Sequence, residues 1–196
     1  MPRDGPDFPL CYHGVVIVLG IDPGSRRCGY GVVEREGRRL RVIESGVLAP
    51  GRLEMPARLG RILSALDEII ARTRPGEVSV EAVYAGTSAR SALVLGQARG
   101  VALAAAARAG LPVFEYTPAE VKVAFTGNGR ADKEQMLRTA RLLFGATPDL
   151  SDEADALALA VCHLARRHRV AIPPRGAPRA ALERVRPARR DHRGMP

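Results

Sequence analysis

The sequence predicts an α/β protein with one mixed sheet of five strands and helices on both of its faces. Two observations predict this fold class. Three strand-like segments follow one another near the start of the chain, which is typical of a three-stranded meander. Helical and strand-like segments then alternate, which favours further strands in the same sheet with helices packed on either side.

Short aliphatic runs mark the strands. The first is almost continuous Val, Ile and Leu, as expected of a strand buried on both faces. Asp22-Pro23-Gly24-Ser25 follows it, with Pro and Gly at the positions that a type II turn requires. The strands are predicted at residues 15–22, 28–34, 40–47, 78–84 and 112–116.

Apolar residues at helical spacing predict the helices. Arg74-Pro75-Gly76 ends the first of them. Asp132 is placed to act as an N-cap, and Ser151 is expected to begin the last helix, where an Asp-Glu pair suits the first turn. The helices are predicted at residues 55–73, 88–109, 118–125, 132–144 and 151–167.

Composition predicts one folded domain with an irregular segment at each end. The chain has 196 residues and a net charge of +9, and residues 166–196 alone contain ten arginines against two acids. We expect residues 1–14 to be a disordered leader, 15–168 to form the domain, and 169–196 to be a basic, disordered tail. The tail could add phosphate contacts or serve only solubility, and the sequence leaves both open.

The sequence also limits where the protein works. No apolar run approaches the roughly 20 residues that a membrane span needs, so we expect no membrane association. Three widely spaced cysteines form no C-x-x-C pair, which fits a reducing cytoplasm better than a disulfide framework or a zinc site.

Four acidic residues suggest chemistry. Asp22 ends the first strand and Glu81 lies inside the apolar segment VSVEAVY. Asp152 and Asp155 stand three residues apart at the start of the last helix, so both project from one helix face. If the first and fourth strands are neighbours at the sheet centre and the last helix packs across them, the four carboxylates converge.

Convergence of these acids would indicate a metal site. Carboxylates in one pocket repel one another and take up protons unless cations lie between them. Ligand sets made only of oxygen favour hard divalent ions such as Mg²⁺ or Mn²⁺. Two such ions about 3.5–4 Å apart can stabilise both the attacking and the leaving oxygen of a phosphoryl displacement.

Each acid also has an ordinary interpretation when taken alone. Asp22 could open a turn, and Glu81 could lie on an exposed strand face that it shares with Ser79. The acids of the last helix could be the charges that commonly begin a helix. Their joint occurrence on two strands and a helix is what favours a working site.

Six segments carry a resemblance to a known family: LGIDPGSRRCGYGVV, SVEAVYAG, ALVLGQARGVALAAA, VFEYTPAEVK, TGNGRADKEQM and DEADALALAVCH. In this order and spacing they resemble the RuvC family of Holliday-junction resolvases, from about Val16 to about Ala165. The resemblance implies a ribonuclease-H-like fold and a homodimeric crossover junction endodeoxyribonuclease. Such an enzyme nicks two opposing strands of a four-way DNA junction symmetrically, in recombination and repair. It also implies RuvA and RuvB as partners.

The resemblance implies roles for individual residues. The family's acidic cluster, which binds two Mg²⁺ or Mn²⁺ ions, corresponds to Asp22, Glu81, Asp152 and Asp155. Lys122 and Lys133 correspond to basic residues near the active site, with Lys122 expected to act in catalysis and Lys133 to bind DNA. They are the only lysines in a chain with 28 arginines, which favours a positional need for the compact ammonium group.

Further DNA contacts are expected from side chains around the acids. Tyr84 occupies the place of a family aromatic that meets bases at the junction, where stacking is worth about 1–3 kcal/mol per base. Arg26 and Arg27, beside Asp22, are expected to bind phosphate rather than to pair with Asp22. Arg99 is a further candidate, although it could instead support helix packing.

Several alternatives remain open from the sequence. The chain could be a ribonuclease-H-like nuclease of different substrate specificity, or a catalytically inactive DNA-binding module. An actin-like ATPase fragment is a weaker alternative, because such proteins need two domains of this kind. The long alanine-rich helix, residues 88–109, is the candidate dimer interface, since a two-fold dimer holds two active sites at a fixed separation.

Overall fold

The computed structural model describes residues 14–82, 89–145 and 151–167. Its strands are β1 (Val16–Asp22), β2 (Cys28–Glu36), β3 (Arg39–Leu48), β4 (Glu77–Glu81) and β5 (Val113–Tyr116). Its helices are α1 (Met55–Thr73), α2 (Ala89–Arg108), α3 (Pro118–Thr126), α4 (Lys133–Phe144) and α5 (Ser151–Arg166). Tyr84, the predicted tail and all of the predicted leader except Gly14 lie outside the described residues.

The sheet is mixed, and β1 lies at its centre. The strand order is β3-β2-β1-β4-β5. The first three strands pair antiparallel as a meander, while β4 runs parallel to β1 and β5 runs parallel to β4. The predicted fold class is confirmed, as is the expectation that the first and fourth strands are neighbours at the sheet centre.

The fourth strand is shorter than predicted. It was expected to reach residue 84, but β4 ends at Glu81 and Ala82 is not part of the strand. The reason is its partner: β5 has only four residues, and the last register pair is Glu81 with Tyr116. One further backbone bond, from the amide of Ala82 to the carbonyl of Tyr116 at 2.8 Å, closes the ladder.

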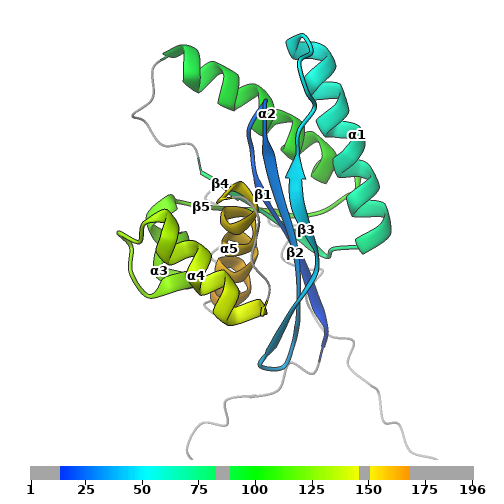
Figure 1. Ribbon diagram of the computed structural model, residues 1–196. Helices are drawn as coiled ribbons and strands as arrows, with labels where there is room; N and C mark the ends of the chain where they lie inside the picture. Colours follow the sequence, from blue (N-terminus) through cyan, green and yellow to red (C-terminus); the bar gives the residue numbers. More distant parts are fainter. Residues whose placement is uncertain (1–13, 83–88, 146–150, 168–196) are drawn as a thin grey trace, which may run out of the picture.

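Helices cover both faces of the sheet (Figure 1). On one face α1 and α2 bury a cluster that includes Leu19, Ile21 and Val80. On the other face α5 lies across β1 and β2 and buries Val18 and Val33. Because neighbouring residues of a strand point to opposite faces, the central strands are apolar on both sides, as their continuous Val, Ile and Leu predicted.

A row of three glycines lets α5 approach the sheet closely. Gly20 of β1 pairs with Gly31 of β2, and Asp22 pairs with Gly29. A Cβ on Gly20 would lie 2.0 Å from the carbonyl oxygen of Ala156, and one on Gly29 would lie 2.0 Å from that of Asp152. No side chain separates the helix backbone from the strands here. We call Gly20, Gly29 and Gly31 the glycine seam.

The turn after β1 is not the type II turn that the sequence predicted. A type II turn requires positive φ at its third residue, and Gly24 does not have it. The glycine serves a different purpose, because a Cβ at this position would lie 2.1 Å from the carbonyl oxygen of Arg27. The chain therefore folds back so closely on this position that a side chain does not fit there.

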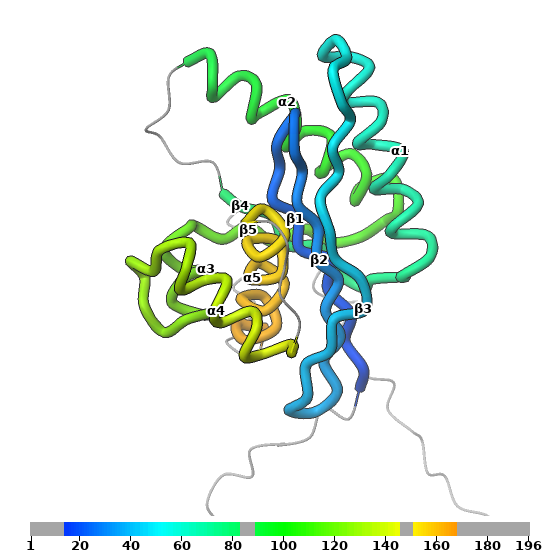
Figure 2. Tube along the Cα trace, in the orientation of Figure 1, coloured from blue at the N-terminus to red at the C-terminus, as the bar shows by residue number. Residues whose placement is uncertain are grey.

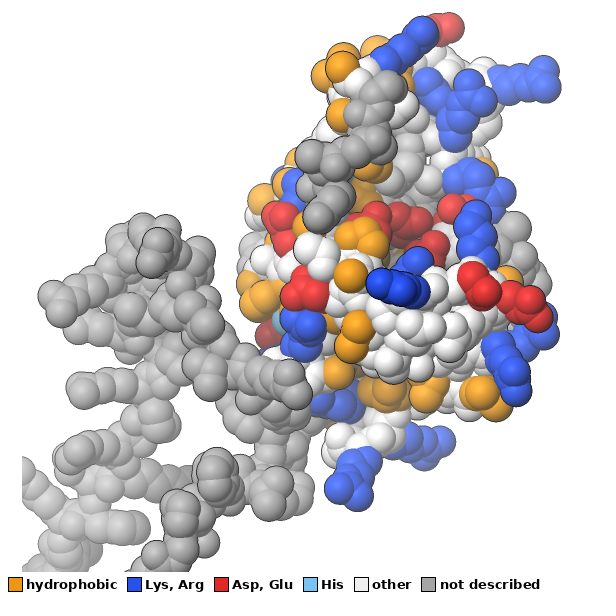
Figure 3. Space-filling model, turned by 90° about the vertical axis from the view of Figure 1, so that its left-hand side faces the viewer, with side chains coloured by type: hydrophobic (Ala, Val, Ile, Leu, Met, Phe, Trp, Pro, Cys, Tyr) orange, Lys and Arg blue, Asp and Glu red, His pale blue; other side chains and the backbone are white. Residues whose placement is uncertain are grey.

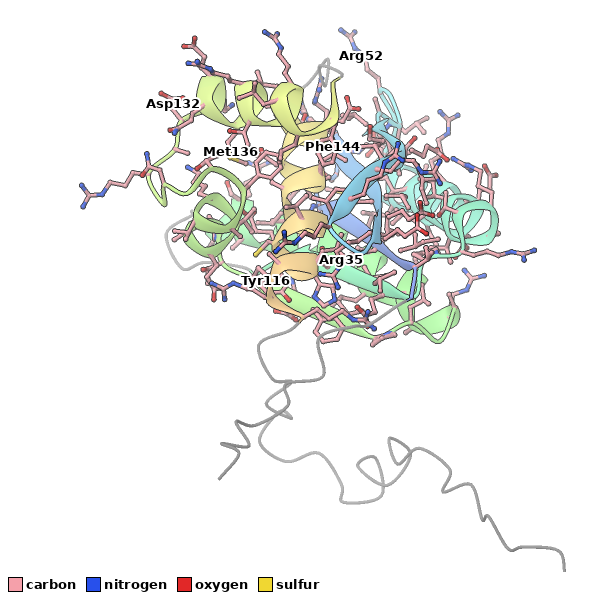
Figure 4. The ribbon with its side chains drawn as sticks, turned by 90° about the horizontal axis from the view of Figure 1, so that it is seen from below. Arg35, Arg52, Tyr116, Asp132, Met136 and Phe144 are labelled. Carbon is pink, nitrogen blue, oxygen red and sulfur yellow. The ribbon has the colours of Figure 1, made fainter. Side chains whose placement is uncertain are left out.

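Two short helices pack on the outer side of α5. A capping box between Thr117 and Glu120 begins α3, and the predicted N-cap Asp132 begins α4 by accepting a bond from the amide of Gln135 at 2.8 Å. Met136 and Phe144 lie on the side of α4 that faces α5 (Figure 4). Both helices pack against residues 158–162, in the middle and later turns of α5.

The glycine seam leads to a stability prediction. We expect Gly20→Ala to lower the free energy of unfolding by about 3 kcal/mol or more, the upper end of the range for overpacked cores, because the added carbon meets helix backbone and not a flexible side chain. Denaturant unfolding would measure this. Gly60→Ala in α1 is the matched control, since a Cβ there meets nothing within 4 Å and alanine favours the helix. Equal stability of the two variants would contradict the prediction.

Candidate active site

The first two acids meet because β1 and β4 are parallel neighbours. In the register, Gly20 lies beside Ser79 and Ile21 beside Val80. Val80 packs toward α1 and α2, so the alternating residues Ser79 and Glu81 face α5. Ser79 is fully buried, which removes the alternative that Glu81 lies on an exposed strand face.

The other two acids are brought by the first turns of α5. The glycine seam places the backbone of Asp152 against Gly29, which is the register partner of Asp22. Asp155 lies about one turn further along the same helix face. Glu153 points elsewhere, because its carboxylate accepts a bond from the Ser45 hydroxyl of β3 at 2.6 Å. This bond also ties the start of α5 to the sheet.

The four carboxylates act on one another through their charges. Burial, followed by the charges of Glu81, Asp155 and Asp152, raises the pKa of Asp22 from 3.8 to about 7. Burial and the charge of Asp155 raise the pKa of Glu81. Burial and the charge of Asp152 raise the pKa of Asp155. The four residues that the sequence selected are therefore one electrostatic cluster.

Both lysines lie close enough to counter this cluster. The charge of Lys122, from α3, lowers the pKa of Glu81 and of Asp155. The charge of Lys133, the first residue of α4, also lowers the pKa of Asp155. Figure 3 shows acidic side chains gathered in the middle of one face, with Lys and Arg side chains around them.

The arginines beside Asp22 take different positions. Arg27 pairs with Asp152 through Nε and Oδ2 at 2.6 Å, and not with Asp22. Arg26 forms no ion pair with a described carboxylate and lines a surface hollow near the turn after β3. Arg99 donates to the backbone carbonyl of Glu81 at 3.3 Å and pairs with Glu115. This geometry favours the packing role for Arg99, because its guanidinium is already engaged at the end of β4.

The donor chemistry of the site fits a hard divalent cation. Its side chains offer only carboxylate oxygens, which Mg²⁺ and Mn²⁺ prefer, and the raised pKa of Asp22 marks negative charge that a cation would neutralise. Among the described residues, no three Asp, Glu, His or Cys side chains are already grouped to hold one ion. Since Asp152 is engaged by Arg27, coordination by all four acids requires side-chain rotation.

His163 lies at the other end of α5 and is fully engaged. Its Nε2 is 2.6 Å from the carboxylate of Glu77, and its Nδ1 is 2.6 Å from the Tyr116 hydroxyl. Arg167 also pairs with Glu77. Figure 4 shows Tyr116 near this end of the helix. The histidine is a structural residue of the core.

Sequence reasoning missed the residues that hold the site together. The glycine seam and the bond from Ser45 to Glu153 were not anticipated. One signal was present: the glycines recur at alternate positions in CGYG and near the end of the preceding strand. Alternation of this kind places glycines on one strand face, where close approach by another backbone is one of their uses.

Comparison with known proteins supports the same interpretation. A family model described as crossover junction endodeoxyribonuclease RuvC matches residues 18–163. A protein of that name from Anaeromyxobacter sp. (strain K) is 74% identical over 186 residues, covering 92% of this chain and all of its own length. Another, from Rubrobacter xylanophilus, is 46% identical over 167 residues, covering 84% of this chain and 93% of its own.

A solved structure shares the fold. Thermus thermophilus RuvC in complex with a Holliday junction substrate has a TM-score of 0.74 at 35% sequence identity, over 79% of this chain and 96% of that one. The ribonuclease-H-like fold predicted from the sequence is thereby confirmed. From its matched segments and the arrangement of its strands and helices, this chain belongs to the RuvC family of crossover junction endodeoxyribonucleases.

Proposed function

We propose that this chain resolves four-way DNA junctions by nicking two opposing strands symmetrically, with Asp22, Glu81, Asp152 and Asp155 as the metal ligands. Membership of the family makes it a DNA endonuclease that acts on Holliday junctions. The observation that supports the residue assignment is the convergence of four carboxylates at the ends of β1 and β4, with both lysines beside them.

The metal requirement follows from the family, whereas the identity and number of the ions are our proposal. We infer two Mg²⁺ or Mn²⁺ ions per site, because four carboxylates supply enough oxygen ligands and enough negative charge for two cations. When bound, such ions activate water and stabilise the charge of the displacement. The charges of the other three acids all act on Asp22, which supports its assignment as a ligand of the same site.

The lysines and Arg27 are placed to receive the DNA backbone. Lys122 lies near Glu81 and Asp155, and we infer that its ammonium holds the scissile phosphate against the acids. Lys133, near Asp155, holds a neighbouring phosphate. The side chain of Arg27 is 46% exposed, so a phosphate can reach its guanidinium when Asp152 turns toward a metal ion.

We propose a homodimer that uses the first half of α2. All buried residues of this helix lie between Ala98 and Ala106, whereas Leu93 is 66% exposed. Figure 2 shows that this part of α2 extends past the sheet. A two-fold dimer would hold two active sites at one separation, as paired nicks across a junction require. RuvA and RuvB stay predictions as further partners.

A cytoplasmic location also stays a prediction. Within the described residues, no helix is long and apolar enough to cross a membrane.

Two of the alternatives drawn from the sequence, a nuclease of different specificity and an inactive DNA-binding module, are not favoured. A nuclease of different specificity would not explain the extent of the match, since relatives aligned over 92% and 84% of this chain bear the junction-endonuclease name. An inactive DNA-binding module would have no need of four intact acids whose mutual repulsion raises the pKa of Asp22.

Cleavage of a defined set of substrates tests the function. With Mg²⁺, we expect paired nicks in a synthetic four-way junction and little cleavage of linear duplex or an RNA–DNA hybrid. Asp22→Asn and Glu81→Gln should abolish nicking while junction binding survives, because each removes a metal ligand and keeps the side-chain size. Gel analysis measures both cleavage and binding. Wild-type cleavage by either variant would refute the ligand assignment, and preference for the hybrid would refute the junction assignment.

Lys122 has a separate test. We expect Lys122→Ala to lower the single-turnover rate of junction cleavage roughly 100- to 1,000-fold, the scale on which removing one charge-stabilising donor acts. Circular dichroism should show an unchanged fold, since Lys122 is only partly buried and forms no described ion pair. An unchanged cleavage rate would show that Lys122 has no role in catalysis.

The raised pKa of Asp22 predicts a pH dependence of stability. Between its ordinary value of 3.8 and about 7, the folded state binds more protons than the unfolded state, so stability falls as the pH rises. The slope is at most about 1.4 kcal/mol per pH unit for one group. Denaturant unfolding with a chelator present, from about pH 4 to pH 8, measures it.

Asp22→Asn is the control for this measurement. In this variant, stability should fall much less as the pH rises. At about pH 8 without metal, the variant should be more stable than the wild-type protein. Mg²⁺ should restore stability to the parent and have less effect on the variant. Parallel curves for the two proteins would show that Asp22 does not titrate in this window.

A further inference from the structure

A basic hollow lies beside the acidic site. It has a volume of about 560 Å³ and opens between the turn that follows β1 and the segment that joins β3 to α1. Arg26, Arg52 and Arg58 line it, together with one acid, Glu54. Arg52 extends from the rim into solvent (Figure 4). Positive charge therefore outweighs negative charge around this hollow.

The three arginines have no anionic partner in the described residues. Arg58 lies four residues after Glu54 in sequence, a spacing that suits an ion pair on a helix, yet the two form none. The Nε of Arg58 is buried and lacks any hydrogen-bond partner; the only other such side-chain atom in the described part of the chain is Oγ of Ser79. Buried donors are almost always satisfied, so the unpaired Nε leaves this guanidinium with a donor to offer a ligand.

The start of α1 adds a second attraction for an anion. Glu54 is the N-cap residue, but its side chain accepts no capping bond, and the first turn contains no acid. The first amide groups of a helix lack partners within the helix, and their dipoles favour negative charge, although Pro56 in this first turn has no amide to offer. A 19-residue helix thus points an uncapped positive end at a hollow already lined by arginines.

The hollow is at the same end of the sheet as the acids. Cys28, at the start of β2, pairs with Leu48, at the end of β3. The segment after Leu48 therefore runs beside the turn that carries Arg26 and Arg27. Arg27 reaches the active site through Asp152, while Arg26 lines the hollow. The same turn thus directs Arg27 to the active site and Arg26 to the hollow.

We propose that this hollow binds a backbone phosphate of the junction DNA, on the strand that flanks the scissile phosphate. The proposal rests on the proposed function, because it takes the DNA in the acidic site as given. An Arg guanidinium matches two phosphate oxygens at once. A hollow of about 560 Å³ exceeds the roughly 30 Å³ share of one water molecule many times over, so it accommodates a sugar-phosphate segment and not only a small ion. Contacts of this kind set the register of the DNA and read no sequence.

The salt dependence of binding tests the proposal. All variants are made in an Asp22→Asn full-length parent with Mg²⁺ present, so that binding to a four-way junction is measured without cleavage. We expect Arg58→Gln to weaken binding roughly tenfold or more and to reduce the slope of log K against log salt by about one. Arg58→Lys should keep the slope and lose affinity, because it retains the charge but not the Nε donor. An unchanged slope for Arg58→Gln overturns the proposal.

Two further variants guard against a folding defect. Arg38→Gln is the matched control, since Arg38 lies in the hairpin at the opposite end of the sheet and should change neither slope nor affinity. Arg52 is exposed, so Arg52→Gln should leave the melting temperature unchanged. It should still reduce the slope of log K against log salt. An Arg52→Gln variant with the parent's slope and affinity counts against the site even if Arg58→Gln fails to fold.

Neutralised phosphates locate the contact. Junctions that carry a methylphosphonate at successive positions should show one position, near the cut, where the parent loses affinity and Arg58→Gln does not. The proposal is overturned if, at every position, the affinity loss caused by the methylphosphonate simply adds to the loss caused by Arg58→Gln. If inorganic phosphate stabilises the parent but not Arg58→Gln, while the DNA slopes are equal, the hollow takes a free anion instead and the proposal fails. Cleavage by the Asp22→Asn parent would contradict the assignment of Asp22 to the active site. It would not contradict phosphate binding in the hollow, which the binding measurements test separately.

Discussion

The close contact between α5 and the glycine seam is the constraint on which the active site depends. Helices usually rest on a sheet through layers of side chains, and such layers would hold the first turn of α5 away from the strand ends. Because Gly20 and Gly29 have no side chain, the helix backbone touches the strands. Asp152 and Asp155 are thereby carried to the place where β1 and β4 end. The bond from Ser45 to Glu153 fixes the same turn from the side of β3.

The two ends of α5 have opposite electrostatic character. At its start, like charges are gathered, and burial together with the charges of the other acids raises the pKa of Asp22 to about 7. At its end, His163, Glu77 and Arg167 satisfy one another. The end of α5 is paired with the protein's own groups, whereas the start gathers like charges that the proposed cations would neutralise. This is the usual relation between a working site, which stores unfavourable interactions, and the scaffold that supports it.

Basic side chains from several different elements lie around the acids. The two lysines approach from α3 and α4 and act directly on the carboxylate charges. Arg27 contacts Asp152 from the turn after β1. Beyond it, the hollow at the start of α1 gathers further arginines. A DNA strand that enters the acidic site can therefore meet positive charge at successive phosphates, which favours one path across the surface.

The sequence by itself determined the elements and the four acids. Strand and helix limits were predicted to within a few residues, and the N-cap Asp132 was found, because periodicity and capping depend on neighbours along the chain. The acids were recognised because each marks the end or interior of an apolar element.

Tertiary structure decided the rest. The end of β4 is set by β5, and the turn at Gly24 is set by the carbonyl of Arg27. The pairing of Arg27 with Asp152 joins residues 125 positions apart. Such contacts arise from how closely elements pack, and no local pattern encodes that distance.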